Sequence, residues 1–154
     1  MDKWMWNVYS GDILPNQYNT KWWEYRMKYQ GIKSPVERSE NDFDPGAKMH
    51  ILNDVSYIRY FFSYILQYIF HEQACKLADH EGPLHLCSIH ESKKAGDALG
   101  DMLALGKSKP WPEALEQYTG SKKISTKAIK SYYKPLIEWL RKKRTEENYT
   151  LGWD

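Results

Sequence analysis

The sequence has little excess charge, few cysteines and no long apolar run, and each shortage excludes a class of protein. Its 22 lysines and arginines are nearly balanced by 20 aspartates and glutamates, and a formal net charge of +2 is too small to indicate nucleic-acid binding. The most apolar stretch, residues 60–70, is about half as long as a membrane span, so it predicts a core helix. The chain contains no charged n-region followed by an apolar h-region, so we expect neither a signal peptide nor a transmembrane segment in it. Taken alone, an N-terminus without a signal peptide predicts a cytosolic protein.

The cysteines are only two, Cys75 and Cys87. Their spacing leaves two possibilities open, which are two free thiols or one disulfide that closes a short loop. Asn148 begins an Asn-Tyr-Thr triplet, which fits the acceptor pattern for N-glycosylation. A cysteine pair together with a glycosylation acceptor favours an extracellular setting.

Motifs of several enzyme classes are missing. The sequence has no HExxH, in which two histidines one helical turn apart bind zinc and the glutamate acts as a base. It also has no GxSxG, no phosphate loop and no GxGxxG. Residues 71–75, HEQAC, have a cysteine where the second histidine is needed. The histidines fall at no metal-binding spacing, and we predict no zinc ligand in this chain.

Aromatic residues are abundant, at 15% of the chain with 7 Trp and 12 Tyr, which suits helix packing or a groove for a peptide. Apolar residues recur with helical spacing, and no pair of strands is indicated, so the predicted fold class is all-α. Pro135 predicts a kink in the last helix, for which Ser125 is the expected N-cap. A long ordered loop is expected over residues 33–53. The expected helices cover residues 1–8, 16–29, 55–79, 92–105, 112–118 and 125–140.

The helix expected over residues 55–79 is apolar around most of its circumference. A helix of this kind is buried inside a larger helical protein. Its polar stripe, Arg59, Ser63, Gln67 and His71, needs partners that the rest of the sequence does not obviously supply. This pattern predicts that the helix belongs to something larger than 154 residues.

The stretch from Asn41 to Phe62 concentrates the residues with the most chemistry. We expect Lys48 and His50 on an extended segment, and Tyr57, Arg59 and Tyr60 on the first turns of the following helix. From residue types alone, Tyr57 and Tyr60 are expected to be core aromatics with satisfied hydroxyls rather than site residues. Lys48 is expected to be a solvated loop charge and His50 a structural histidine.

Several segments resemble the zinc peptidyl-dipeptidase family typified by angiotensin-converting enzyme, also called the peptidyl-dipeptidase A family. The resemblance extends from Met1 to Trp153. It implies that residues 1–154 are the C-terminal segment of a single, larger, mostly α-helical and two-lobed peptidase domain, whose zinc-binding part lies upstream. The segments that carry it are MDKWMWNVYSGDI, KWWEYRMKYQG, NDFDPGAKMH, SYIRYF, FHEQACK, GPLHLC, KPWPEAL, YYKPLIEWLR and LGW.

The resemblance assigns roles in the reaction to four residues. Lys48 and Tyr57 match residues that hold the free C-terminal carboxylate of the substrate, which agrees with the preference of a carboxylate for an ammonium and a hydroxyl donor. His50 matches a histidine that hydrogen-bonds the substrate and steadies the transition state. Tyr60 matches a tyrosine whose hydroxyl stabilises the oxyanion.

It also implies ion sites and a covalent link. Arg59 matches a ligand of one chloride ion, and Trp22 and Arg26 match ligands of another. Cys75 and Cys87 match a family disulfide. No residue of this chain matches a zinc ligand.

The function that the resemblance implies is a zinc metallopeptidase that releases dipeptides from oligopeptides with a free C-terminus. Zinc and chloride are the implied cofactors, with the zinc ligands and the rest of the domain upstream, so the isolated chain is expected to be inactive. The full-length enzyme is expected to be an extracellular glycoprotein, secreted or membrane-anchored. The alternative is a truncated, non-catalytic paralogue that acts as a helical peptide-binding or interaction protein.

Overall fold

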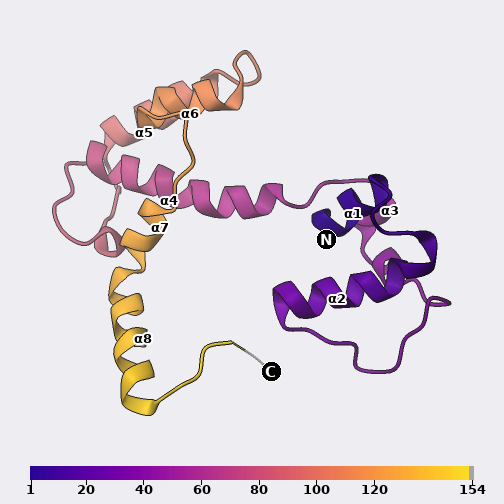
Figure 1. The fold of residues 1–154 in the computed structure, drawn as a ribbon. Helices are drawn as coiled ribbons and strands as arrows, with labels where there is room; N and C mark the ends of the chain where they lie inside the picture. Colours follow the sequence, from indigo (N-terminus) through magenta and orange to yellow (C-terminus); the bar gives the residue numbers. More distant parts are fainter. Residues whose placement is uncertain (153–154) are drawn as a thin grey trace. The chain divides into compact units, whose positions relative to one another are not determined.

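The computed structural model describes residues 1–152, and within this range it contains helices, turns and loops but no strand (Figure 1). The predicted all-α fold class is therefore confirmed. The contacts divide the described chain into two compact units, residues 1–61 with Gly152 and residues 62–151. Trp153, the last residue of the family resemblance, lies outside the described residues.

The core of the first unit lies between α1 (Asp2–Tyr9) and α2 (Tyr18–Gln30). Trp4 of α1 meets Trp22 of α2 edge to face, with ring centroids 5.9 Å apart, and its indole nitrogen donates to the Tyr18 carbonyl at 3.0 Å. A 3-10 turn, η1 (Pro15–Gln17), leads into α2. Gly31, in the left-handed conformation, ends α2. The two predicted N-terminal helices are both present.

The long loop after α2 is held by one polar network. Asn19, only 1% exposed, donates to the Asp44 carboxylate at 3.0 Å and accepts from the Asp44 amide at 2.9 Å. Trp23 donates to the same carboxylate at 2.8 Å, and Arg38 pairs with it. Buried polar groups that satisfy one another in this way fix a loop as firmly as packing does. The prediction of an ordered loop is confirmed.

The segment that follows differs from the prediction. A 3-10 turn, η2 (Asp44–Ala47), runs directly into the short helix α3 (Met49–Leu52). Lys48 is extended and begins α3, because its carbonyl accepts from the amide of Ile51 at 2.8 Å, but His50 lies on the helix. The predicted extended run through both residues is wrong, since the helical turn satisfies backbone groups that a lone extended segment leaves unpaired.

The central helix α4 (Arg59–Leu77) begins later than predicted. Tyr57 precedes it and lies outside the helix, because the Asp2 carboxylate accepts from the amides of Tyr57 and Ile58 at 2.7 and 3.1 Å and from the Ser56 hydroxyl at 2.9 Å. This carboxylate supplies the acceptor that helix starts need. Arg59 and Tyr60 occupy the first turn as expected.

Residues 1–152 do not bury α4 on all sides. Phe61 and Tyr64 are 61% and 54% exposed, and the buried positions are Ile65, Ala74 and Cys75. Within the described residues, burial is reached at one position in the first half of the helix and two in the second. That a larger protein buries the rest stays a prediction. Among the described residues, no helix combines the length and apolar character needed to cross a membrane.

The second unit packs around the later part of α4. α5 (Lys93–Ala104) begins at Ser92, whose hydroxyl accepts from the Ala95 amide, and it packs against α6 (Trp111–Thr119). Tyr118 of α6 is buried and meets the ring of Phe70 edge to face at 5.4 Å. The turn η3 (Leu84–Leu86) is joined to α4 by a disulfide between Cys75 and Cys87.

The last predicted helix is two helices, α7 (Lys127–Tyr132) and α8 (Lys134–Glu147). Pro135 is in the first turn of α8, where its missing N–H costs nothing, so the predicted kink is a full break. Thr126 is the N-cap of α7 in place of Ser125, although the Ser125 hydroxyl still accepts from the Lys127 amide at 3.2 Å.

Candidate carboxylate-binding site

One cavity of about 920 Å³ in the first unit gathers half of the site residues that the sequence singled out. Its walls come from the N-terminal residues and α1, from α2, from Lys48 just before α3, and from residues 57–61 at the start of α4. This volume lies within the range typical of ligand sites. The predicted residues that line it are Trp22, Arg26, Lys48, Tyr57 and Tyr60.

Lys48 and Tyr57 meet at one wall of this cavity. The Lys48 ammonium lies 4.5 Å from the centroid of the Tyr57 ring, within range of a cation–π interaction. The contact holds a positive charge over the face of the Tyr57 ring. Together they offer the two kinds of donor that a carboxylate binds best.

His50 does not line the cavity, but it supports Tyr57 from behind. The two rings are perpendicular, at 87°, with centroids 4.6 Å apart. His50 Nδ1 is buried and has no hydrogen-bond partner among residues 1–152. An unpaired buried nitrogen of this kind is costly, and it leaves a donor or acceptor position open for a ligand.

Tyr60 lies next to Tyr57, with ring centroids 5.0 Å apart. The Arg59 guanidinium lies 5.3 Å from the centroid of the Tyr60 ring. The sequence neighbours therefore form one row of contacts, from Lys48 through Tyr57 and Tyr60 to Arg59. A cation beside a phenol favours any negative charge that forms near the hydroxyl.

Arg26 and Trp22 are on another wall. The Arg26 guanidinium lies 5.7 Å from the centroid of the Trp22 ring, and Trp22 is buried. Arg26 Nε is buried and has no hydrogen-bond partner among the described residues. A buried guanidinium nitrogen without a partner fits an anion, so this wall fits the implied chloride.

Zinc does not fit the described residues in the same way. Among residues 1–152, the His, Cys, Asp and Glu side chains grouped closely enough to hold a metal ion are His71, Cys75 and Cys87. Both sulfurs of this group are joined in the disulfide. The oxidised chain therefore offers no set of free ligands that resembles a catalytic zinc site.

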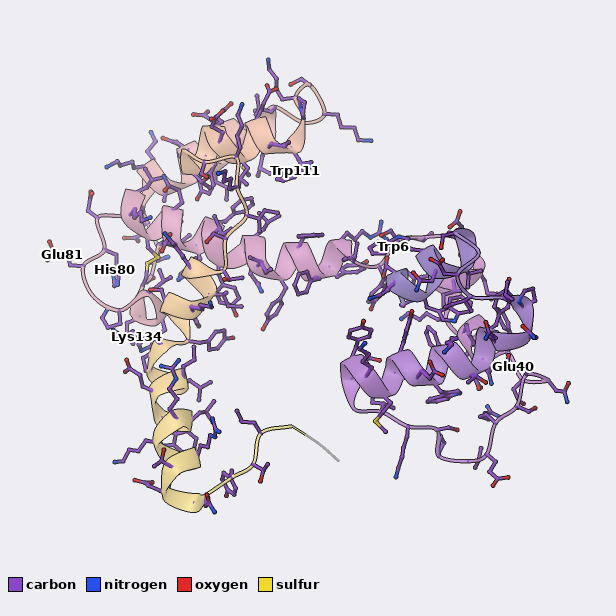
Figure 2. The ribbon with its side chains drawn as sticks, in the orientation of Figure 1. Trp6, Glu40, His80, Glu81, Trp111 and Lys134 are labelled. Atoms are coloured by element: carbon purple, nitrogen blue, oxygen red, sulfur yellow. A yellow bond between two sulfur atoms is a disulfide. The ribbon has the colours of Figure 1, made fainter. Side chains whose placement is uncertain are left out.

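Sequence reasoning missed Asp2 and the outer wall of the cavity. Asp2 is 9% exposed and connects α1 to the residues before α4. Burial by itself raises the pKa of Asp2, but the donors from Tyr57, Ile58 and Ser56 outweigh it and hold that pKa below its ordinary value. Nothing local in the sequence pairs residue 2 with residues 56–58. The outer wall includes Lys3, Trp6, Tyr25 and Tyr29, of which Trp6 is labelled in Figure 2.

The predicted glycosylation acceptor belongs to the second unit. Asn148 is exposed and follows the last turn of α8, in the left-handed conformation. Such a surface position is what a glycan requires.

The described residues thus form an all-α fold in which a lysine and two tyrosines line one cavity. Comparison with known proteins gives the family. A family model described as angiotensin-converting enzyme, peptidase M2, matches residues 1–153. The chain therefore belongs to the angiotensin-converting enzyme family of peptidases.

Individual relatives support the same family assignment. Angiotensin-converting enzyme of Oryctolagus cuniculus is 50% identical over 153 residues, which are 99% of this chain and 12% of that protein. Angiotensin-converting enzyme-like protein Ace3 of Mus musculus is 50% identical over 153 residues and 21% of its length. Angiotensin-converting enzyme of Theromyzon tessulatum is 49% identical over 152 residues and 25% of its length. The chain thus spans a quarter or less of these relatives.

Proposed function

We propose that this chain is the substrate-anchoring part of a peptidyl-dipeptidase, a hydrolase that releases dipeptides from the free C-termini of oligopeptides. Residues 1–154 are then the C-terminal segment of one catalytic domain. The observation that carries the proposal is the meeting of Lys48, Tyr57 and Tyr60 on one cavity. Such a segment belongs to an extracellular enzyme, secreted or anchored to a membrane.

In this proposal the anchoring groups act on two parts of the peptide. The Lys48 ammonium and the Tyr57 hydroxyl donate to the terminal carboxylate. The Tyr60 hydroxyl donates to the carbonyl oxygen of the bond that breaks, and this hydrogen bond strengthens as the oxygen gains negative charge. The family resemblance assigns His50 a hydrogen bond to the substrate; His50 packs on Tyr57 and does not itself line the cavity.

The anchoring groups also determine which peptide bond is cleaved. A dipeptide spans about 7 Å of extended chain. A carboxylate held at Lys48 therefore brings the second peptide bond from the C-terminus to the neighbouring Tyr60. The zinc ligands and the general base that the family resemblance implies are outside these residues, in an upstream part of the same domain.

Chloride is the ion that the described residues fit. The unpaired Arg26 Nε beside Trp22 supports one chloride site. The Arg59 guanidinium, which lies over the Tyr60 ring, supports a second chloride site. A chloride bound there would help to keep the guanidinium stacked on that ring.

Peptide binding tests the proposal on the 154-residue chain. We expect an oligopeptide with a free C-terminal carboxylate to bind, and its C-terminal amide to bind roughly 10- to 100-fold more weakly, because a hydrogen bond to a charged group contributes about 1.5–3 kcal/mol. Calorimetric titration measures both affinities. Lys48→Met should remove the difference between acid and amide.

Lys33→Met is the matched control, because Lys33 is an exposed loop lysine outside the cavity. This variant should discriminate acid from amide as well as the unaltered chain does. Equal affinity of the unaltered chain for acid and amide would contradict the proposal.

A further inference from the structure

The last turns of α8, drawn in yellow in Figure 1, have a run of four basic residues that the proposed function does not use. The run is Arg141-Lys142-Lys143-Arg144, and Thr145 follows it. Lys143 is half-buried and the other three are exposed, with 75% exposure of the Lys142 side chain. Elsewhere in the sequence, no more than two lysines or arginines stand in a row. The run therefore concentrates positive charge in a chain whose net charge is only +2.

We propose that this run is a processing site, at which an endoprotease of the subtilisin class that is specific for basic residues cleaves the bond between Arg144 and Thr145. Water adds across this peptide bond, so Arg144 gains a terminal carboxylate and Thr145 a terminal ammonium. The products are residues 1–144 and residues 145–154. Such proteases act in the secretory pathway, and only this meeting of chain and protease rests on the extracellular setting of the proposed function.

The order of the four residues matches what such a protease recognises. Proteases of this class bind basic side chains at the first, second and fourth residues before the cleaved bond, in pockets lined with carboxylates. Arg144, Lys143 and Arg141 occupy these three positions. Arginine suits such a pocket because its planar guanidinium can donate two hydrogen bonds to one carboxylate. Neither arginine takes part in an ion pair among residues 1–152, so both charges are available to a protease.

The rest of the sequence offers no second match. The other basic pairs are residues 93–94 and 122–123, and each pair consists of two lysines. The fourth residue before the bond is Glu91 for the first pair and Gly120 for the second. The second pair is exposed in the segment between α6 and α7, so accessibility alone would favour cleavage there. This pair is therefore an internal control for specificity.

Local contacts alone hold the bond in the folded helix. Within α8, residues 134–147, no residue is buried. The Arg144 carbonyl, which belongs to the bond, accepts from the amides of Asn148 and Tyr149. The lysines of the run pair with glutamates three or four residues further on, at 3.2–3.6 Å. All of these partners lie within five residues of one another in sequence.

A protease binds its substrate as an extended chain, so the last turns of α8 must open before the bond is cleaved. Isolated helices shorter than about 12–15 residues are only marginally stable in water. Exposed ion pairs along a helix add little to that stability. A helix end without buried side chains therefore opens at low cost, and cleavage follows the open fraction of the chain.

Digestion of the oxidised 154-residue chain tests the proposal. The chain is incubated with a purified, calcium-dependent endoprotease of this class, and mass spectrometry identifies the products. We expect fragments 1–144 and 145–154, and no cleavage after Lys123. Trypsin, which needs only one basic residue, should cleave after Lys123 as well, because this segment is exposed.

Three variants at exposed positions of the run identify the residues that the protease recognises. Arg144→Gln should abolish cleavage at this bond, and Arg141→Gln should slow it at least about tenfold, because each change removes a charged hydrogen-bond donor. Lys142→Gln is the matched control at the third residue before the bond. Its cleavage rate should stay within about twofold, because the exposed ion pair with Glu146 contributes little. Circular dichroism shows whether each variant keeps its helices.

Two results overturn the proposal. One is a chain that stays intact with a protease that cleaves a synthetic peptide of residues 138–150, because the folded helix would then withhold the bond. The other is cleavage of Arg141→Gln at the rate of the unaltered chain, because the run would then be an ordinary basic site. Neither result involves Lys48 or Tyr57, so the outcome is independent of the proposed peptide binding.

Discussion

At the scale of single residues, Asp2 organises the site without touching the substrate in the proposed function. Its carboxylate accepts three hydrogen bonds from the segment that carries Tyr57. The hydrogen bonds lower the pKa of Asp2 in the folded chain despite burial, which alone raises it. A carboxylate with a lowered pKa contributes stability above its unfolded value of about 3.9, and this contribution is lost as the pH falls through the folded pKa.

We therefore predict that Asp2→Asn lowers the free energy of unfolding by about 1–2 kcal/mol at pH 7, as the loss of a charged cap does. Below about pH 4, the unaltered chain should lose this advantage and the two stabilities should converge. Urea unfolding at a series of pH values measures both. Asp97→Asn, at an exposed position of α5, should leave the pH dependence unchanged. Parallel curves for Asp2→Asn and the unaltered chain would refute the prediction.

Arg26 gives the second prediction at this scale. If its unpaired Nε holds chloride, chloride should stabilise the chain by about 1.4 kcal/mol at ten times the dissociation constant. Thermal unfolding in chloride and in gluconate at equal ionic strength measures this difference. Arg26→Gln should abolish it, whereas Arg144→Gln, at an exposed position on α8, should retain it. Equal stabilisation of Arg26→Gln by chloride would exclude this site.

At the scale of elements, the loop between α2 and α3 determines where Lys48 lies. Asn19 on α2 holds this loop through the Asp44 amide, the Asp44 carboxylate and the Ser39 carbonyl, with distances of 2.9–3.0 Å. Asn19→Ala removes the partner of the Asp44 amide and one partner each of the Ser39 carbonyl and the Asp44 carboxylate, which keeps Trp23 and Arg38. We expect a loss of about 2–3 kcal/mol in the free energy of unfolding.

The same change should weaken binding of a free C-terminal carboxylate, because Lys48 loses its fixed position. Calorimetric titration with the peptide of the Lys48 experiment measures this second effect. Asn41→Ala, at an exposed position of the same loop, should alter neither quantity. Unchanged stability of Asn19→Ala would show that the network does not hold the loop.

The helices themselves were largely predictable, because their signals are local. Apolar periodicity predicted α5, the start at Pro15 or Asn16 predicted α2, and Gly31, Gly120 and Ser92 marked ends that the structure has. The start of α4 was not predictable, since it depends on a carboxylate more than fifty residues away in sequence. Pro135 predicted a kink in the last helix, but not that the helix would break into α7 and α8, because a proline does not indicate how far the helix is interrupted.

The candidate site was predictable to a similar degree. Lys48, Tyr57 and Tyr60 are close in sequence, so their grouping in one cavity needed only the family resemblance. The wall with Arg26 depends on the packing of α2 against α1, which no local pattern encodes. The placement of His50 behind Tyr57 was missed because a single helical turn has no periodic signal.

At the scale of the whole molecule, the aromatic side chains of α4 argue for more protein around it. Phe61, Phe62 and Tyr64 are 61%, 42% and 54% exposed. Several exposed aromatic side chains on the first turns of one helix are typical of an interface. We propose that the upstream part of the same catalytic domain covers it. Sequencing the transcript upstream of Met1 should then reveal an open frame that includes HExxH, whereas a stop codon directly before Met1 would favour the truncated paralogue.

The last prediction concerns the 154 residues as an isolated, oxidised chain. Without HExxH, and with Cys75 and Cys87 joined, this chain lacks the ligands of a catalytic zinc ion and the glutamate that acts as base. We expect it to bind a free C-terminal carboxylate but to release no dipeptide. Metal analysis and a chelator-sensitive hydrolysis assay measure the two properties together. Stoichiometric zinc with hydrolysis that a chelator stops would mean that these residues form a complete catalytic centre, and would overturn the division of the site between this segment and an upstream part.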